Sequence, residues 1–368
     1  MRRFHVTAAL VLVALTTACR GADGGVAVVS SVTEPAPDTT EPVPDTTELA
    51  PATAEPVPDT TEPVLDTTEP APDTTESVRH EVATLEGAIT DPARDRLIPY
   101  LVYAPMGIDG EVPLILVSHG GTGNARGHLS APHLGTTFAM GGFVAIHVGH
   151  LPSDTAAGQL SDRPADITFV LDQLEAGAIE SAPGFIGTVD LTRAGHTGHS
   201  FGAYTSHAVG GATYANTSGT SRDDRIDAIA PISPQGPDQM GGFDRGPEDN
   251  TWTTVTIPSY NLIGGAEVDS NAVDSIRRPG WRLAPFDRYP DVSDTFRSII
   301  ADQIHSDMWR TGRPEVQQFI AGEILEFMRV YVAGDADADP CSIGVGGLAT
   351  VSLERHPAAT GSLISTCG

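Results

Sequence analysis

A serine, two carboxylates and a histidine follow one another in an order that could support nucleophilic catalysis. Ser200 is the centre of Gly-His-Ser-Phe-Gly at 198–202, a G-x-S-x-G motif in which the serine occupies a tight turn between a strand and a helix. A serine hydroxyl needs a histidine as general base and a carboxylate that orients this histidine. Glycine makes up 39 of the 368 residues, so the motif alone would arise by chance roughly 0.3 times. The assignment therefore depends on the partners of Ser200.

Both partners are expected downstream of Ser200, the carboxylate before the histidine. An apolar segment at 259–264 is followed by Gly-Ala-Glu-Val-Asp, which presents two acids two residues apart. Asp269 is the first choice for the carboxylate and Glu267 is the alternative. His305 and His356 are the histidines beyond Asp269, and His305 directly follows an apolar segment. We expect His305 to be the general base.

Two backbone N–H groups would be needed to stabilise the oxyanion that forms when a serine attacks an acyl carbon. Phe201, the residue after the serine, is expected to supply one of them. The loop Ser-His-Gly-Gly-Thr-Gly at 118–123 follows a strand-like segment, and its glycines allow an amide to point into a site. We expect Gly121 to supply the second.

Strand-like and helix-like segments alternate from about residue 78, which predicts a single α/β domain with a mostly parallel sheet and helices on both faces. The site residues would then lie together, because the carboxyl ends of parallel strands meet at one edge of the sheet. The expected strands are 112–118, 143–148, 193–198, 226–232, 259–264 and, as the last one, 297–304. The expected helices are 164–175, 201–210 and 316–332.

Five stretches carry a resemblance to a known group of enzymes: 91–96 before the first strands, 118–121, 163–172, 198–202 and 305–307. Over about 81–332 the chain resembles the bacterial hydrolases often called predicted dienelactone hydrolases. That group is similar to the platelet-activating-factor acetylhydrolases and, more distantly, to cutinase-like polyesterases. The resemblance implies the α/β-hydrolase fold, a triad of Ser200, Asp269 and His305, an acyl-enzyme intermediate and no cofactor. True dienelactone hydrolases use a cysteine nucleophile, so the name of the group does not indicate the substrate.

The N-terminal region reads as an export signal followed by a stalk. Residues 1–19 combine two arginines with a short apolar run and end in Leu-Thr-Thr-Ala-Cys, which resembles a bacterial lipobox. Either Cys19 becomes lipidated and tethers the protein to a membrane, or the protein is secreted; both place it outside the cell or on its surface. Residues 20–77 contain a seven-residue acidic Pro/Thr repeat that cannot form a helix or a core and predicts an extended, disordered spacer.

The predicted hydrolase domain spans 78–334, and a C-terminal extension spans 335–368. The extension contains Cys341 and Cys367, which we expect to form a disulfide in an oxidising compartment. The segment 233–249, which follows a strand at the active edge, is a candidate wall for the acyl pocket.

The composition excludes several classes of function. The formal net charge is −27, which argues against binding to nucleic acid. The chain has no lysine, so a Schiff base, a Ser-Lys dyad and a P-loop are excluded. The zinc motifs H-E-x-x-H and H-x-x-E-H are missing, so no metal is expected.

The sequence therefore favours a monomeric serine hydrolase acting on carboxylic esters, of the carboxylesterase, lipase or platelet-activating-factor acetylhydrolase type. A cutinase-like polyester hydrolase is the nearest alternative. Less favoured are an exported peptidase and a non-catalytic envelope binding protein on a hydrolase scaffold.

Overall fold

The fold is that of a computed structural model, which describes residues 79–368 except 122, 156–157, 215–219, 238–249, 270–279, 346–347, 349–350 and 368. The expected signal segment, Cys19 and the acidic repeat lie outside the described residues. The described residues belong to one compact unit, Pro72–Gly368. Within the described part, no helix has the length and apolar character needed to cross a lipid bilayer.

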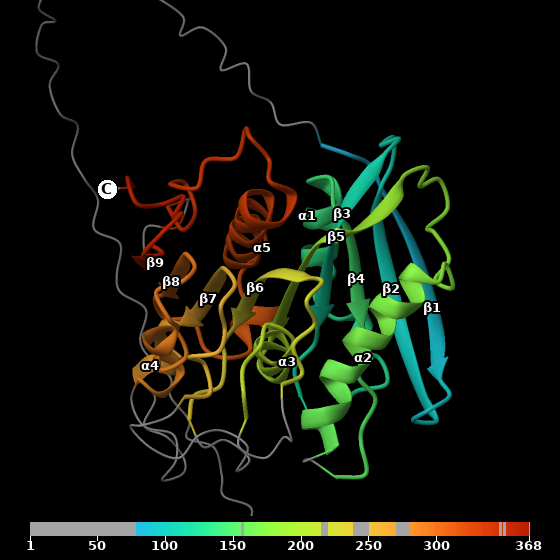
Figure 1. Cartoon of the computed structure of the whole chain (residues 1–368), viewed down its shortest axis with the longest axis horizontal. Helices are drawn as coiled ribbons and strands as arrows, with labels where there is room; N and C mark the ends of the chain where they lie inside the picture. The colour runs from blue at the N-terminus through green and yellow to red at the C-terminus, as the bar shows by residue number, and fades with distance from the viewer. Residues whose placement is uncertain are drawn as a thin grey trace, which may run out of the picture. The chain divides into compact units, whose positions relative to one another are not determined.

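A mostly parallel sheet of nine strands forms the centre of the described unit, in the order β1-β2-β4-β3-β5-β6-β7-β8-β9 (Figure 1). The strands from β4 to β8 in this order are parallel to one another. The pairs β1–β2, β2–β4 and β8–β9 are antiparallel. The strands are β1 (Val82–Asp91), β2 (Arg96–Pro105), β3 (Glu111–Ser118), β4 (Val144–Val148), β5 (Thr188–His199), β6 (Ile226–Ile232), β7 (Ser259–Gly264), β8 (Thr295–Ile300) and β9 (Val351–His356).

Helices cover both faces of this sheet, so the expected α/β class is confirmed. They are α1 (Pro132–Met140), α2 (Gly158–Glu175), α3 (Phe201–Val209), the short α4 (Gly265–Asp269) and α5 (Pro314–Met328). Helices α2 and α3 pack against each other, as do α1 and α5. In Figure 1, α2 and α3 lie on the nearer face of the sheet and α1 and α5 on the farther one.

The alternation of side chains along β3 shows how the sheet separates two apolar cores. Leu114 and Leu116 join the core that includes α2 and α3, whereas Ile115 and Val117 join the core that includes α1 and α5. Successive residues of a strand point to opposite faces, so a strand buried on both faces must be apolar throughout. This explains the apolar run at 112–117 within β3.

Most of the predicted elements are present, and two of them have the predicted bounds, since β6 is Ile226–Ile232 and β7 is Ser259–Gly264. Two placements were wrong. The stretch 91–96 does not precede the first strands, because Asp91 ends β1 and Arg96 begins β2, so that it forms the turn of a hairpin. The strand near 297–304, which is β8, is not the last, because β9 follows it.

The C-terminal extension, 335–368, contributes the strand β9 to the sheet. β9 pairs with the whole length of β8, from Thr295 opposite His356 to Ile300 opposite Val351. The carboxylate of Asp294, just before β8, accepts hydrogen bonds from two backbone N–H groups of the extension.

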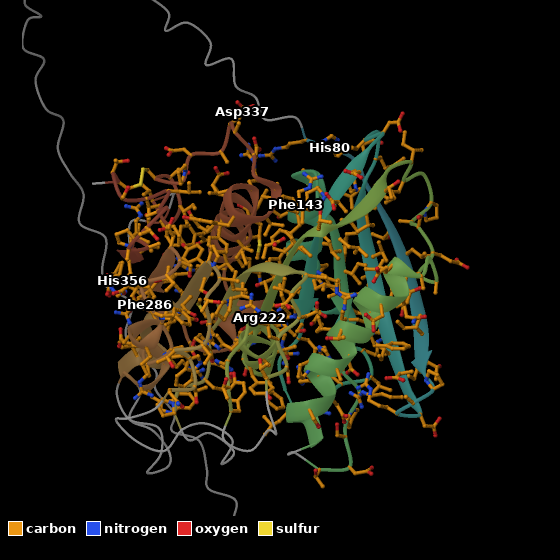
Figure 2. The ribbon with its side chains drawn as sticks, viewed as in Figure 1. His80, Phe143, Arg222, Phe286, Asp337 and His356 are labelled. Carbon is orange, nitrogen blue, oxygen red and sulfur yellow. A yellow bond between two sulfur atoms is a disulfide. The ribbon has the colours of Figure 1, made fainter. Side chains whose placement is uncertain are left out.

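The expected disulfide between Cys341 and Cys367 is present in this extension. The ring of His356, the other histidine downstream of Asp269, lies 4.3 Å from the ring of Phe286 (Figure 2). His356 is the last residue of β9 and therefore lies at an edge of the sheet.

Candidate active site

Ser200 lies between β5 and α3 in a backbone conformation that side chains seldom adopt, with φ 55° and ψ −116°. Its N–H donates to the carbonyl of Ile232 at the end of β6, which holds the turn in place. The flanking glycines are required by close backbone approaches. A Cβ on Gly202 would lie 2.0 Å from the carbonyl oxygen of Ser118, and a Cβ on Gly198 would lie 2.6 Å from that of Gly202. The turn is therefore a sharp elbow that presents the Ser200 hydroxyl at the end of the strand.

His305 connects this hydroxyl to a carboxylate. Its Nε2 is 2.8 Å from Ser200 Oγ, and its Nδ1 is 2.7 Å from Oε2 of Glu267. The loops that carry the two partners touch, because the N–H of Ala266 donates to the carbonyl of Gln303. The carboxyl ends of β5, β7 and β8 thus bring three residues that are far apart in the sequence into one hydrogen-bonded chain.

Two acids were expected as candidates for the carboxylate beside His305, Asp269 first and Glu267 as the alternative. Glu267, the alternative acid, faces His305 and takes the place expected for Asp269. Both acids belong to α4, and successive residues of a helix are rotated by about 100°. Residues two apart on a helix point in widely different directions. The side chain of Asp269 lies outside the described part of the chain.

Two other groups hold the Glu267 carboxylate. Ser233 Oγ donates to Oε1 at 2.6 Å, and Arg282 Nε lies 2.5 Å from Oε2. Arg282 also donates to the carbonyls of Ser233 and Pro234. Burial raises the pKa of Glu267, but the hydrogen bond from His305, the charge of Arg282 and the Ser233 hydroxyl outweigh it and leave the pKa below its ordinary value. Glu267 is therefore ionised at neutral pH.

His199, the residue before the serine, contacts His305 through a hydrogen bond and through its ring. Its Nε2–H donates to the carbonyl of His305 at 2.8 Å, and the two rings lie 4.5 Å apart. The ring of Trp309 stacks on His199 with 5.4 Å between the ring centres. Neither His199 nor Trp309 was expected at the site from the sequence. The one local signal for His199 was its place directly before Ser200, at the first variable position of the G-x-S-x-G motif.

The two residues expected to supply the oxyanion amides lie in α3 and in the loop after β3. Phe201 is the first residue of α3 and is buried. Gly121 has φ +81°, a conformation that favours glycine. Its neighbour Gly120 lies against the elbow, because a Cβ there would be 3.2 Å from the Cβ of Ser200. In the segment 233–249, the candidate acyl-pocket wall, residues 238–249 lie outside the described part.

A hydrogen-bonded series of fully buried polar side chains lies behind the elbow. Asp166 Oδ2 is 3.0 Å from His150 Nδ1, and His150 Nε2 is 2.9 Å from Ser118 Oγ. Ser118 Oγ is also 2.9 Å from His196 Nε2, and His196 Nδ1 is 2.8 Å from Ser206 Oγ. All five side chains are 0% exposed. They connect α2, β3, β5 and α3 behind the serine.

Asp166 also connects two stretches that lie far apart in the sequence, 91–96 and 163–172. Arg96 donates to both of its carboxylate oxygens, at 2.7 and 2.9 Å, and Arg94 donates to it at 2.8 Å. The stretches 91–96 and 163–172 are thus two halves of one buried ion-pair network. No local pattern in the sequence indicates that they meet.

Burial keeps six histidines of the described domain neutral. It lowers their pKa far below the ordinary value, and we refer to these six residues as the buried histidines: His119 (about 2), His147, His196, His199 and His207 (about 3 each) and His150 (about 4).

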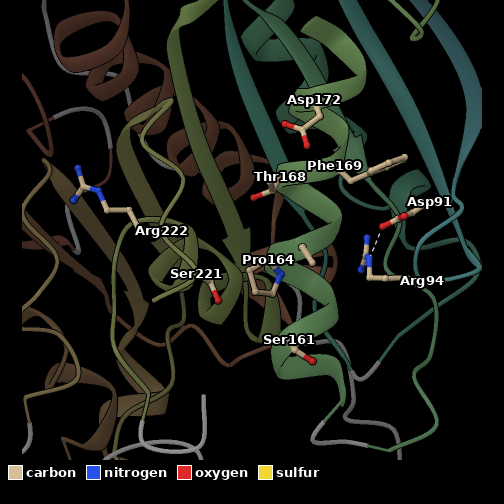
Figure 3. A pocket seen from close by; sticks show the side chains of 10 residues that line it. Asp91, Arg94, Ser161, Pro164, Thr168, Phe169, Asp172, Ser221 and Arg222 are labelled. Atoms are coloured by element: carbon tan, nitrogen blue, oxygen red, sulfur yellow. Dashed lines mark hydrogen bonds and ion pairs between the residues drawn. The ribbon is translucent and has the colours of Figure 1, made fainter. Parts of the chain in front are cut away.

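A hollow of about 370 Å³ opens over the outer side of α2 (Figure 3). It is lined by Asp91, Arg94, Ser161, Pro164, Ala165, Thr168, Phe169, Asp172, Ser221 and Arg222. Its two arginines already face carboxylates, Arg94 that of Asp91 and Arg222 that of Asp224. None of the residues linked to Ser200 lines this hollow, so the candidate active site lies elsewhere.

No group of three or more histidine, cysteine, aspartate or glutamate side chains is placed to hold a metal ion in the described part of the chain. A scan against models of protein families found no match, and a search of curated proteins found none either. The functional interpretation therefore depends on the geometry of the site.

Proposed function

We propose that this chain is a serine hydrolase of the α/β-hydrolase fold that cleaves carboxylic ester bonds through an acyl-enzyme intermediate. The hydrogen-bonded chain from Ser200 through His305 to Glu267, set on a sharp strand-to-helix elbow, is the observation that carries this proposal. In the proposed mechanism, Glu267 replaces Asp269 as the acid of the triad.

The reaction begins when Ser200 Oγ attacks the acyl carbon of the ester and His305 Nε2 accepts the hydroxyl proton. The negative charge of Glu267 stabilises the imidazolium that forms, and its position fixes the proton on Nδ1. The N–H groups of Phe201 and Gly121 stabilise the oxyanion. His305 then protonates the leaving alcohol, and water activated by the same histidine releases the acid from Ser200.

Two features favour this chemistry over a purely structural role of the three residues. The side chain of His305 is 39% exposed, so a substrate can reach the base, whereas that of Glu267 is 5% exposed. The strained conformation of Ser200 costs about 1–3 kcal/mol and is typical of functional residues.

The experiment compares the parent protein with Ser200→Ala, using p-nitrophenyl acetate as the substrate and a fluorophosphonate probe as the label. We expect the parent to hydrolyse the ester and to be labelled on Ser200, and the variant to lose both while its circular dichroism and Tm are retained. A parent that neither turns over esters nor reacts with the probe would instead support the non-catalytic binding protein. A series of esters from acetate to palmitate, together with a polyester film, separates small esterase, lipase and cutinase-like activities.

We further propose that the enzyme works outside the cytoplasm, tethered through Cys19 or secreted. The Cys341–Cys367 disulfide supports this location, because disulfides persist in oxidising compartments. Labelling of growing cells with a fatty-acid analogue should modify the parent and not Cys19→Ser if the tethered form is correct.

A further inference from the structure

Three consecutive carbonyl groups in the loop after β3 each accept a hydrogen bond. Arg163 Nη1 donates to the carbonyl of His119 at 2.7 Å, and Arg163 Nη2 donates to that of Gly121. Between them, the carbonyl of Gly120 is 2.8 Å from Nδ1 of His119. A loop of this kind would be free to turn its peptide groups, since glycine restricts the backbone little. Here each carbonyl is fixed.

The proton on His119 can be assigned from its surroundings. The backbone N–H of His150 donates to His119 Nε2 at 2.9 Å, so Nε2 carries no hydrogen. Burial lowers the pKa of His119 to about 2, with further lowering by His150 and Arg163, and the ring is neutral. A neutral ring without a hydrogen on Nε2 has one on Nδ1. His119 therefore donates to the carbonyl of Gly120.

Arg163 touches both segments that carry the expected oxyanion donors. Besides holding the carbonyl of Gly121, its guanidinium lies 4.7 Å from the centre of the Phe201 ring. Its side chain is 0% exposed, and its Nε donates to Gln159 at 3.0 Å. Burial lowers the pKa of Arg163 to about 9, against the opposing charge of Asp166, so the group is still charged at neutral pH.

The direction of the Gly121 amide follows from these contacts. A peptide unit is planar and trans, so the N–H of Gly121 points opposite to the carbonyl of Gly120. His119 draws that carbonyl toward its own ring, and the N–H must then point away from the ring. Donors that already point the right way stabilise an oxyanion without reorganising during the reaction.

We propose that Arg163 and His119 are positioning residues that preorganise the oxyanion hole: Arg163 joins the Gly121 loop to Phe201, and His119 sets the direction of the Gly121 N–H. This inference rests on the proposed function, since an oxyanion must form for the loop to act on it. Neither residue touches the substrate.

The test compares Arg163→Met with the parent, using p-nitrophenyl acetate and a trifluoromethyl ketone that adds to Ser200 and forms an oxyanion. We expect kcat to fall by about 10²–10³, the loss typical of a missing oxyanion donor, with KM within threefold of the parent. The inhibition constant of the trifluoromethyl ketone should rise in proportion to the loss in kcat/KM. If the role of Arg163 were purely structural, Arg163→Met would lower the Tm but leave kcat/KM and the inhibition constant at the values of the parent.

A second pair of variants keeps the test independent of the folding of Arg163→Met. His119→Asn places an amide N–H near the position of Nδ1 and should retain most of the activity, whereas His119→Leu lacks the donor and should lose about 10–100-fold in kcat. Equal activities in the two His119 variants would overturn the role of His119.

The control is Arg225→Gln, which also removes an arginine bound to α2, through Asp172, but leaves the elbow untouched. It should lower the Tm without changing kcat or the inhibition constant. If the parent is active and labelled but Arg163→Met behaves like this control, the role of Arg163 is wrong and the proposed function stands. If the parent is inactive, the proposed function itself has failed.

Discussion

Replacing Glu267 by glutamine should separate the charge of the acid from its geometry. The carboxylate accepts from His305 and Arg282 on Oε2 and from the Ser233 hydroxyl on Oε1. In Glu267→Gln the amide oxygen is expected to take the place of Oε2, because an NH₂ group there would face two donors. The Ser233 hydroxyl can turn and accept from the NH₂ group. The position of His305 is then kept while the negative charge beside it is lost.

The size of the effect follows from the geometry. A carboxylate and an imidazolium with about 4 Å between their charges attract by about 4 kcal/mol at an effective dielectric constant of about 20. This energy is gained in the transition state, where the imidazolium exists, and hardly in the ground state. Its loss should lower kcat by about 10³ and leave KM nearly unchanged.

The matched variant is Asp269→Asn, which makes the same chemical change two residues away. We expect its kcat to stay within threefold of the parent. Initial rates on p-nitrophenyl acetate would be measured well below the Tm of each variant, because Glu267→Gln removes the ion pair between Glu267 and Arg282 and the Tm should fall. The reasoning fails if Glu267→Gln retains more than a tenth of the parent kcat, or if Asp269→Asn is the variant that loses activity.

Three further outcomes can be measured on the folded protein. Below about pH 6.5 the histidines of the unfolded chain bind protons, whereas the buried histidines of the folded protein do not. The free energy of unfolding should therefore fall by up to about 2 kcal/mol per histidine between pH 6.5 and pH 5. Urea midpoints that do not change with pH would contradict this. Gly202→Ala, whose Cβ would lie 2.0 Å from the Ser118 carbonyl, should cost about 3 kcal/mol in urea unfolding, whereas Gly322→Ala, with open space around its Cβ, should cost nothing. Replacing Cys341 and Cys367 by serine opens a bridge with a sequence separation of 26 and should cost about 3–4 kcal/mol without changing kcat, as the Tm and initial rates would show.

The sequence predicted the strands that are buried on both faces and missed those at the edges. β6 and β7 are mostly apolar segments whose signal is local, and their bounds were predicted correctly. β9 is short, polar and only partly buried, and its conformation depends on pairing with β8 rather than on its own pattern. The hairpin of β1 and β2 was missed because its turn at 91–96 lacks the Asn-Gly or Asp-Gly pair that marks a tight hairpin.

For the candidate site, the order of Ser200, an acid and His305 along the chain was sufficient to select residues that the fold brings together. It could not choose between Glu267 and Asp269, because that choice depends on the direction in which α4 leaves β7. Arg163 and His119 lie 44 residues apart in the sequence, and no local pattern shows that one holds the other's carbonyl.

The place of β9 in the sheet has a consequence for how the protein is made. β8 leads to His305, and its outer neighbour is the last strand along the described chain. Until residue 356 has left the ribosome, one edge of β8 has unpaired N–H and C=O groups, which favours association with other chains. Ser200, the proposed nucleophile, is therefore synthesised long before β8, which pairs with β7 on one side, gains its second neighbour.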